Sequence, residues 1–206
     1  MSSNTVWEIS VQSPLQAVVE DASAPDLLTF PLRQFVPWQV RNEMKVSQVM
    51  AAPQLAAPWV AMLIALGAQV SDGERTLPLA EVMYRRHPWQ TLLVPNDGWT
   101  AASDYVARAP TDEPIVYAAA AVRVDNGVLR GIRVALNGVS RLAVYIPQSP
   151  ARWVGQPFAE ETVQAIARAV AEEVRPRGDF RGSEEYRRAM AHVLTRRAIE
   201  HAGIRP

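Results

Sequence analysis

Residues 115–138 read IVYAAAAVRVDNGVLRGIRVALNG, two runs rich in apolar and β-branched residues on either side of an Asn-Gly pair. Asn126 and Gly127 favour a type I′ turn, because both central residues of that turn need a positive φ angle. The stretch therefore predicts an antiparallel hairpin. A third apolar run, 142–146, is predicted to add a strand to the same sheet.

Apolar residues at helical spacing predict two long helices after this sheet. The first covers about 159–174 and has two glutamates in its first turn, where the helix dipole favours negative charge. The second begins behind Ser183, a good N-cap, and is expected to end before Gly203. Its expected apolar face consists of Tyr186, Met190, Val193 and Leu194. Strands followed by helices predict an α+β unit, with a three- to four-stranded antiparallel sheet packed on helices.

The first half of the chain is expected to hold a smaller α+β arrangement of short elements. A buried helix is predicted over 58–67, with Gly67 as its stop, and Asp72-Gly73 predicts a second hairpin. We expect an extended segment over 43–57 and a surface linker over 84–114. The other expected elements are a strand over 6–11, a helix starting at Pro14, an apolar helical stripe over 27–36 and one helical turn over 79–83.

Composition excludes several kinds of function. Lys+Arg and Asp+Glu both number 21, which argues against non-specific binding to nucleic acid or to an anionic membrane. There is no cysteine, so a disulfide, a thiolate zinc site, an iron–sulfur cluster and a cysteine nucleophile are excluded within this chain. The N-terminus has no signal-peptide pattern, and no apolar run is long enough to span a bilayer. We therefore expect a soluble cytoplasmic protein.

Three stretches of the second half resemble a known family in order and spacing. They are RVDNG at 123–127, IRVALNGV at 132–139 and DFRGSEEYRR at 179–188, and VLTRRA at 193–198 continues the series. They resemble the C-terminal domain of the flavin subunit of molybdenum hydroxylases, the FAD-binding medium subunit of carbon monoxide dehydrogenase and the matching domain of xanthine dehydrogenase. The resemblance implies a small antiparallel sheet backed by helices, FAD as a cofactor, and assembly with a molybdenum-containing large subunit and an iron–sulfur subunit.

The first half of this chain resembles part of the family's FAD-binding domain, namely its second half. The similar segments are residues 9–21 and the Gln-x-Arg-Asn motif at residues 39–42. Family members then carry Thr-Ile-Gly-Gly-Asn and an aspartate about a dozen residues later. A loop that holds a pyrophosphate needs glycines, so that backbone N–H groups approach the phosphate oxygens. The first glycine of this chain is Gly67. In the same register this chain has Lys45, Val46, Ser47, Gln48 and Val49 in the loop, and Pro58 in place of the aspartate.

These departures predict that FAD does not bind in the family's manner. We expect a non-catalytic scaffold or interaction protein, with a truncated FAD-binding-domain remnant in 1–100 and a flavoprotein C-terminal-like domain in 101–206. The expected partners are another copy of the chain or the large and iron–sulfur subunits of a molybdenum hydroxylase. The alternative is an FAD-binding electron-transfer subunit of a carbon monoxide or xanthine dehydrogenase-type oxidoreductase. A third possibility is a small-molecule sensor that uses the vacated cofactor cleft.

The remaining polar clusters predict structure rather than chemistry. The three histidines lack the spacing of a metal site, the glutamate pairs fall at helix ends, and no Gly-x-Ser-x-Gly elbow is present. We therefore predict no catalytic residue and no metal ligand. Asp179 is expected to pair with Arg181 or Arg187, next to the Ser183 cap. Possible interface residues are Trp89, Trp99, Trp153, Asp179, Arg181, Tyr186 and Arg187.

Overall fold

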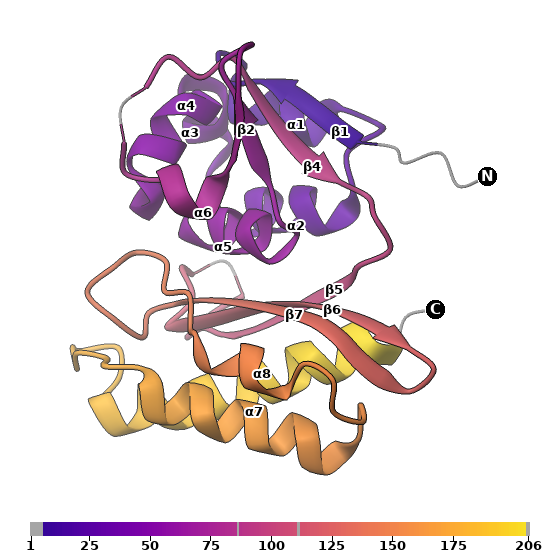
Figure 1. The fold of residues 1–206 in the computed structure, drawn as a ribbon. Helices are drawn as coiled ribbons and strands as arrows, with labels where there is room; N and C mark the ends of the chain where they lie inside the picture. The colour runs from indigo at the N-terminus through magenta and orange to yellow at the C-terminus, as the bar shows by residue number, and fades with distance from the viewer. Residues whose placement is uncertain (1–5, 86, 111, 205–206) are drawn as a thin grey trace.

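The computed structural model describes residues 6–85, 87–110 and 112–204, and it contains two antiparallel sheets in separate layers (Figure 1). The first sheet has the strand order β1-β4-β2-β3 and the second has the order β5-β6-β7. Within the described residues, no helix combines the length and the apolarity that crossing a membrane requires. The strands are β1 Val6–Ser10, β2 Gln69–Ser71, β3 Thr76–Pro78, β4 Thr91–Pro95, β5 Thr100–Val106, β6 Val116–Asp125 and β7 Val128–Asn137.

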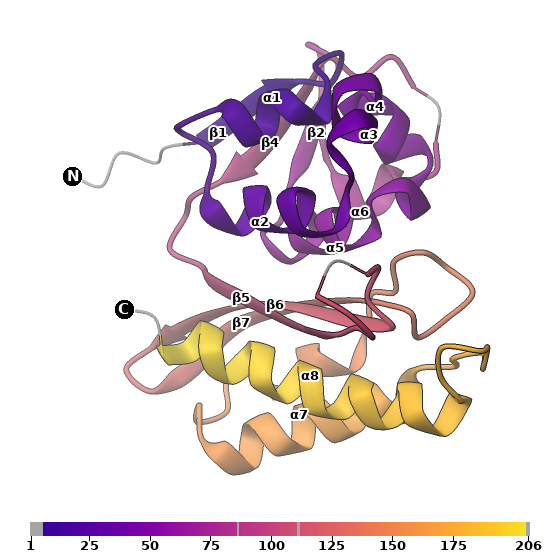
Figure 2. The same ribbon diagram turned by 180° about the vertical axis from the view of Figure 1, so that it is seen from behind.

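The helices of the first half surround the first sheet, and those of the second half lie beneath the second sheet (Figures 1 and 2). In the first half they are α1 Leu15–Glu20, α2 Asp26–Phe35, α3 Trp38–Glu43, α4 Val46–Ala51, the 3₁₀ turn η1 Pro53–Leu55, α5 Ala57–Ala65 and α6 Leu79–Val82. In the second half they are the 3₁₀ turn η2 Ser149–Trp153, α7 Glu160–Glu173 and α8 Glu184–Ile204.

The β6–β7 hairpin confirms the turn predicted at Asn126-Gly127. Asn126 has a φ of 50° and Gly127 a φ of 73°, as a type I′ turn requires at both central residues. The strands then pair from Asp125 and Val128 to Tyr117 and Asn137, with one irregularity in register near Arg123. The hairpin is therefore ten residues long on each side and forms the centre and one edge of the second sheet.

Both faces of the second sheet are covered, which explains the run of alanines in β6. Val116, Ala118, Ala120 and Val122 face the core formed with α7 and α8. Tyr117, Ala119 and Ala121 join the core of the first half, where the wholly buried helix α5 packs across β6 and β7. Small side chains on this face allow a helix to approach the sheet closely. The cores of the two layers therefore meet at the second sheet. The predicted division into two domains near residue 100 stays a prediction.

The third strand of the second sheet differs from the prediction. Residues 142–146 make only an isolated bridge, in which Leu136 and Tyr145 exchange backbone hydrogen bonds of 2.8 Å. The place of the third strand is taken by β5, and both β4 and β5 lie within the segment 84–114 that was predicted as a linker. The sequence of β5, TAASDYV, has little strand character of its own, and its pairing with β6 and packing on α8 determine its conformation.

Three other expectations were wrong. The segment 43–57 is not extended, because it contains α4, whose buried face is formed by Val46, Val49 and Met50. Helix α8 does not end before Gly203 but continues to Ile204. Gly203 lies against the ring of Phe158, which a Cβ atom at this position would overlap. Tyr186 is 38% exposed, and neither Met190 nor Val193 is fully buried. The buried face of α8 instead consists of Arg187, Ala191, Leu194, Thr195, Ala198, Ile199 and Ala202.

Candidate functional site

The positions that correspond to the family's glycine loop form the start of helix α4. The N–H of Lys45 donates to Oε1 of Gln48 at 2.8 Å, and the N–H of Gln48 donates back to the carbonyl of Lys45 at 3.1 Å. The N–H groups of Val46 and Ser47 donate to the carbonyls of Ser13 and Val11, at 3.0 and 2.8 Å. A helix N-terminus binds phosphate through N–H groups that have no partner in the protein. Here all four N–H groups, from Lys45 to Gln48, have one.

The side chains at these positions also fill the space. Val46 is fully buried in the first core, and the ammonium group of Lys45 donates to Oε1 of Gln12 at 3.2 Å. Pro58, at the position of the family's aspartate, is buried in the first turn of α5 and carries no side-chain hydrogen-bonding group. These residues do not fit a flavin dinucleotide held by a backbone cradle and a carboxylate.

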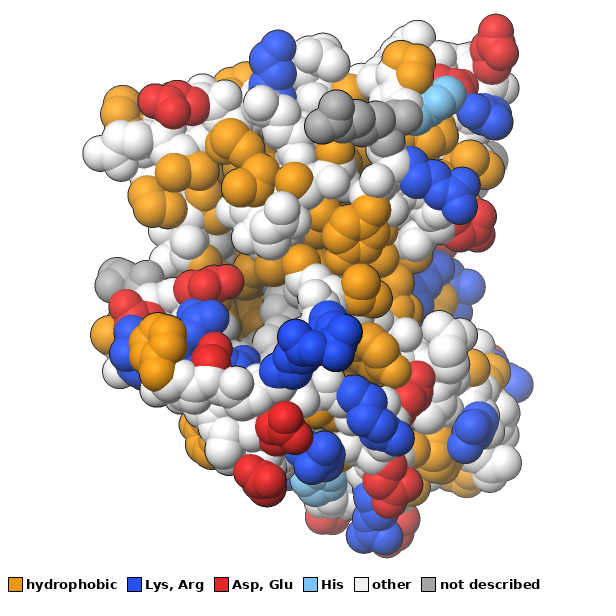
Figure 3. All heavy atoms as spheres, turned by 90° about the vertical axis from the view of Figure 1, so that its left-hand side faces the viewer, with side chains coloured by type: hydrophobic (Ala, Val, Ile, Leu, Met, Phe, Trp, Pro, Cys, Tyr) orange, Lys and Arg blue, Asp and Glu red, His pale blue; other side chains and the backbone are white. Residues whose placement is uncertain are grey.

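A cleft of about 440 Å³ opens between the two layers at the N-terminal end of α5. Figure 3 shows this side of the molecule, which is hollowed between the layers and carries basic side chains below the hollow. The upper wall is formed by residues that precede or begin α5 and by Tyr84, and the lower wall by the loop after β7 and by the start of the α8 region. The lining residues are Gln54, Ala57, Pro58, Tyr84, Glu113, Pro114, Asn137, Gly138, Ser140, Arg141, Leu142, Ala143 and Arg181.

Two lining residues of this cleft have unusual features that the sequence reasoning missed. Asn137 is 6% exposed; its Nδ2 donates to the carbonyl of Ala143 at 2.7 Å, and its Oδ1 has no partner among the described residues. Tyr84 has a φ of 70°, a left-handed conformation that costs a residue with a side chain about 1–2 kcal/mol. Asn137 precedes Gly138, so the sequence indicated only a turn there, and no sequence signal marked Tyr84.

Below the cleft, the predicted cluster of Asp179, Arg181 and Arg187 is present at the start of α8. Arg187 is 3% exposed and donates to the carbonyls of Ile115 and Gly138, at 2.6 and 2.9 Å, and to Oδ1 of Asp179 at 2.8 Å. This hydrogen bond from Arg187 lowers the pKa of Asp179 to about 2. Arg181 lies 3.0 Å from Glu113 and 3.7 Å from Asp179. The cluster therefore ties the start of α8 to the open end of the β6–β7 hairpin, where β6 begins and β7 ends.

Ser183 and Tyr186 lie beside this cluster. Ser183 caps α8 as expected, because its Oγ accepts a hydrogen bond of 3.1 Å from the N–H of Tyr186. The ring of Tyr186 covers Gly182 and remains partly exposed. Neither residue lines the cleft at α5. Their positions are those of a helix start.

The three candidate interface tryptophans lie in different places. Trp89 is only 7% exposed and packs against the ring of His87 at 4.2 Å between ring centres. Trp99 is half-buried between two guanidinium groups, with the Cζ of Arg133 at 3.9 Å and that of Arg123 at 5.1 Å from its ring centre. Trp153, in η2, is partly buried against the second core. The structure does not bring these tryptophans together into one surface.

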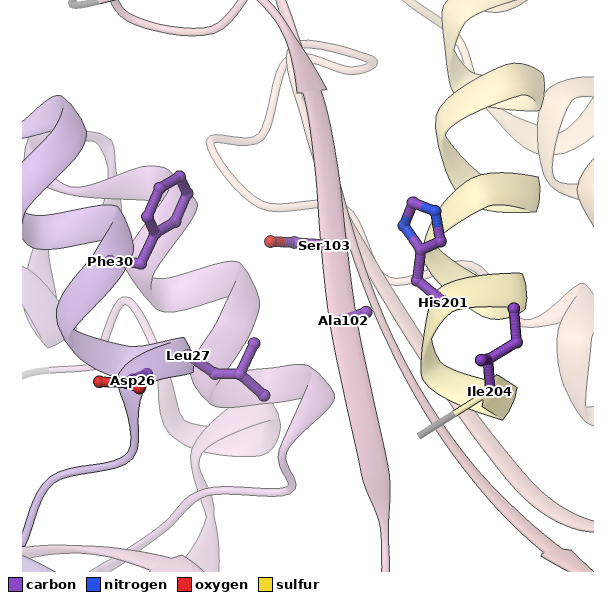
Figure 4. Close-up of a pocket in the computed structure, with 7 residues that line it drawn as sticks. All are labelled: Asp26, Leu27, Phe30, Ala102, Ser103, His201 and Ile204. Carbon is purple, nitrogen blue, oxygen red and sulfur yellow. The ribbon is translucent and has the colours of Figure 1, made fainter. Parts of the chain in front are cut away.

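A second hollow, of about 580 Å³, lies on the opposite edge of the second sheet along β5 (Figure 4). Leu27 and Phe30 project from α2 on one side of the strand, and His201 and Ile204 project from the end of α8 on the other. The described residues hold no group of three or more His, Cys, Asp or Glu side chains that would bind a metal ion. This groove is open and apolar, and it contains no convergent set of polar groups for chemistry.

The chain is an α+β protein with two layers, each built on an antiparallel sheet. In the second layer, helices α7 and α8 pack against the β6–β7 hairpin. Residues 101–202 match the CO dehydrogenase flavoprotein C-terminal domain. These residues, just under half of the chain, form a domain of this family, and the chain is homologous to the FAD-binding medium subunits of carbon monoxide and xanthine dehydrogenases.

The relatives identified by sequence are medium subunits. The carbon monoxide dehydrogenase medium chain of Hydrogenophaga pseudoflava is 32% identical over 108 residues, which cover 52% of this chain and 37% of the relative. The nicotine 6-hydroxylase medium subunit of Paenarthrobacter nicotinovorans is 24% identical over 183 residues, which cover 81% of this chain and 63% of the relative. The match to the first relative thus spans little more than a third of its length.

Solved structures share the fold over nearly the whole chain. Carbon monoxide dehydrogenase from Hydrogenophaga pseudoflava superposes with a TM-score of 0.81 at 23% identity, over 98% of this chain and 77% of that chain. Quinoline 2-oxidoreductase from Pseudomonas putida 86 superposes with a TM-score of 0.77 at 22% identity, over 98% of this chain and 76% of that chain. The fold class expected from the sequence, an α+β chain with a three- to four-stranded antiparallel sheet on helices, is confirmed, and the sheet has three strands.

Proposed function

We propose that this protein is a non-catalytic scaffold or interaction subunit derived from the flavin subunit of a molybdenum hydroxylase, and that it holds no FAD. The observation that carries the proposal is the start of α4. The four N–H groups from Lys45 to Gln48 all donate within the protein, to partners on the 11–13 segment or within the helix itself. A pyrophosphate at this place would have to break those hydrogen bonds.

Opening the start of α4 to a pyrophosphate would also cost free energy. A bound pyrophosphate would accept from the N–H groups of Val46 and Ser47 and leave the carbonyls of Ser13 and Val11 without their present donors. An unpaired buried carbonyl costs about 1–3 kcal/mol, which would subtract from the binding energy of the dinucleotide. Burial of Val46 and Val49 adds to the cost, because melting the first turn of α4 would expose them. Glycine, which lowers such costs in backbone cradles, is missing from this part of the chain.

The partners we propose are a second copy of this chain or the large and iron–sulfur subunits of a molybdenum hydroxylase. The support is the homology to medium chains and to structures of carbon monoxide dehydrogenase and quinoline 2-oxidoreductase. A chain that keeps the fold without the cofactor would fill the structural place of a medium subunit without transferring electrons.

The alternative function is an FAD-binding electron-transfer subunit. It is favoured by one observation, the retention of both layers of the fold at a TM-score of 0.81 to carbon monoxide dehydrogenase. In this alternative, residues from a neighbouring polypeptide would supply the phosphate-binding groups. The cleft at the N-terminus of α5 would then hold part of the cofactor.

Flavin content separates the two functions. The protein is purified without added flavin, its absorbance is recorded in the flavin bands, and FAD is titrated into it by calorimetry. The xanthine dehydrogenase FAD-binding subunit of Escherichia coli O157:H7, treated in the same way, serves as the positive control. We expect a colourless protein and no saturable heat. A yellow protein with one FAD per chain would overturn the proposal in favour of the alternative.

A further inference from the structure

Another cleft between the two layers lies at the C-terminal end of α5, at the opposite end of this helix from the first cleft. It has a volume of about 380 Å³ and is bounded above by segments between α5 and α6 and below by β7 and the chain that follows Tyr145. We call it the β7 notch. In Figure 1 it lies below α5 and α6 and above β7. Its walls are mainly apolar, with Ile64, Ala68 and Pro78 above and Ile132, Ile146 and Pro150 below.

The notch exists because one edge of β7 is open. On this edge Leu136 and Tyr145 exchange backbone hydrogen bonds of 2.8 Å. A strand that continued in this register would place Pro147 opposite Val134, and proline has no N–H group to donate. The chain therefore leaves the sheet after Tyr145. Ile132 points its N–H and C=O to the same edge as Leu136, because the pattern repeats every second residue, and neither group has a partner among the described residues.

Arg133 supplies the one charged side chain in the lining of the notch. Its guanidinium group rests on the ring of Trp99 at 3.9 Å and lies against Gly67, which also lines the notch. Nη1 is covered and has no hydrogen-bond partner among the described residues. Nε and Nη2 have no such partner either, but they are not covered. Both therefore keep surface that an acceptor in the notch can reach.

The positive charge of Arg133 is only partly balanced by the protein. Asp97 is close enough to attract it but forms its ion pair with Arg123, at 3.3 Å, so one carboxylate faces two guanidinium groups. The C-terminal end of α5 adds about half a negative charge. Burial lowers the pKa of Arg133, because the charged form loses contact with water. Charges that lose their water in folded proteins are usually paired, so the group that would complete this site is an anion.

We propose that the β7 notch binds a small carboxylic acid with an apolar body, in its ionised form. The carboxylate accepts hydrogen bonds from Nε and Nη2 of Arg133, which lie side by side on one edge of the planar guanidinium group. The apolar body lies between the two walls, where the notch has room for it. The N–H group of Ile132 is a further donor on the lower wall. This inference goes beyond the proposed function, and it requires neither the presence nor the absence of FAD.

The test uses the whole protein and three probes. These are 4-methylpentanoate, the neutral amide of the same acid, and acetate, which has the charge without the apolar body. Binding is followed by the backbone amide resonances of Ala68 and Ile132 and by the Nε–H resonance of Arg133. We expect saturable shifts with 4-methylpentanoate in the millimolar range or below. The amide is expected to bind about tenfold more weakly, because a hydrogen bond to a charged acceptor is about twice as strong as a neutral one. Acetate is expected to bind more weakly still, because it buries little apolar surface.

Two variants with matched controls make the test specific. Arg133→Gln is expected to remove the difference between the acid and its amide, whereas Arg130→Gln, at an exposed arginine of the same strand outside the notch, leaves it unchanged. Ala80→Leu places a larger side chain in the notch and is expected to weaken binding of 4-methylpentanoate several-fold. Ala189→Leu, at an exposed helical alanine outside the notch, is its control. Because Arg133 also packs on Trp99, Arg133→Gln is used only if its amide spectrum is that of a folded protein, and Ala80→Leu decides otherwise.

Three outcomes would overturn the proposal. One is the absence of saturable shifts at Ala68 and Ile132 with 4-methylpentanoate. Another is equal affinity for the acid and its amide, since the guanidinium group would then play no part. The third is equal weakening by Ala80→Leu and Ala189→Leu, because binding would then lie outside the notch. Flavin absorbance enters none of these measurements, so a failure here leaves the proposed function as it stands.

Discussion

The guanidinium carbon of Arg133 lies 3.9 Å from the ring centre of Trp99, and the end of the same side chain presses against Gly67. Gly67 follows the C-terminal end of α5, where a cation interacts favourably with the helix dipole. Arg133 belongs to β7 of the second sheet. One side chain thus joins the last turn of the buried helix to the sheet beneath it.

Gly67→Ala is predicted to destabilise the protein more than Gly98→Ala. Both glycines have a positive φ, 74° and 81°, so both substitutions incur a conformational cost of about 1–2 kcal/mol. A Cβ at Gly67 would also overlap the guanidinium of Arg133, whereas a Cβ at Gly98 would meet nothing within 4 Å. Urea unfolding of the two variants measures the difference. Equal losses of stability would contradict a role for the Arg133 contact.

Arg187→Met is predicted to reduce the free energy of unfolding by about 2–4 kcal/mol. The substitution leaves the carbonyls of Ile115 and Gly138 without their charged donor, and each such hydrogen bond is worth about 1.5–3 kcal/mol before relaxation. Arg187→Lys is expected to recover only part of this loss, because an ammonium group does not reproduce the planar fork of donors.

The matched control for Arg187 is its neighbour. Arg188→Met, one position along α8 and only partly buried, is expected to change the free energy of unfolding by less than about 1 kcal/mol. Chemical denaturation of the three variants is the measurement. A loss at Arg188 as large as that at Arg187 would mean that the network at the start of α8 contributes nothing specific.

The local parts of this fold were predictable and the long-range parts were not. The Asn126-Gly127 turn, α7 and the pairing of Asp179 with Arg187 depend on residues close in sequence or on strong periodicity. The strand β5 was missed because its alanines and serine become a strand only when paired with β6. The same limit applies to the cleft at α5. It brings together Pro58, Tyr84 and Asn137, whose proximity no local pattern encodes.

Acid is predicted to destabilise the protein through Asp179. Its pKa is lowered to about 2 by the hydrogen bond from Arg187, below the value of 3.8 for the free side chain. A carboxyl with a lowered pKa contributes stability above its unfolded-state pKa, and this contribution is lost as the pH falls from about 4 to about 2. The free energy of unfolding, measured against pH in the native protein and in Asp179→Asn, gives the contribution.

In the Asp179→Asn variant the slope of stability between pH 4 and about pH 2 is expected to be smaller, because the variant has no proton to bind at this position. The side chain is 38% exposed, so the difference is a modest one. Asp125→Asn, at an exposed aspartate whose side chain is 61% accessible, is the control. Parallel curves for the native protein and Asp179→Asn would show that the pairing with Arg187 does not persist in solution.

The two faces of β6 give a prediction about how the layers are joined. Ala121→Leu places a larger side chain in the core shared with α5, and Ala120→Leu places it in the core shared with α7 and α8. Overpacking either core is expected to cost about 1–3 kcal/mol. The two substitutions differ in where protection from amide hydrogen exchange is lost. Ala121→Leu is expected to lower protection in α5 while α8 stays protected, and Ala120→Leu to do the reverse. If both variants reduced protection in α5 equally, β6 would not separate the two cores as the structure indicates.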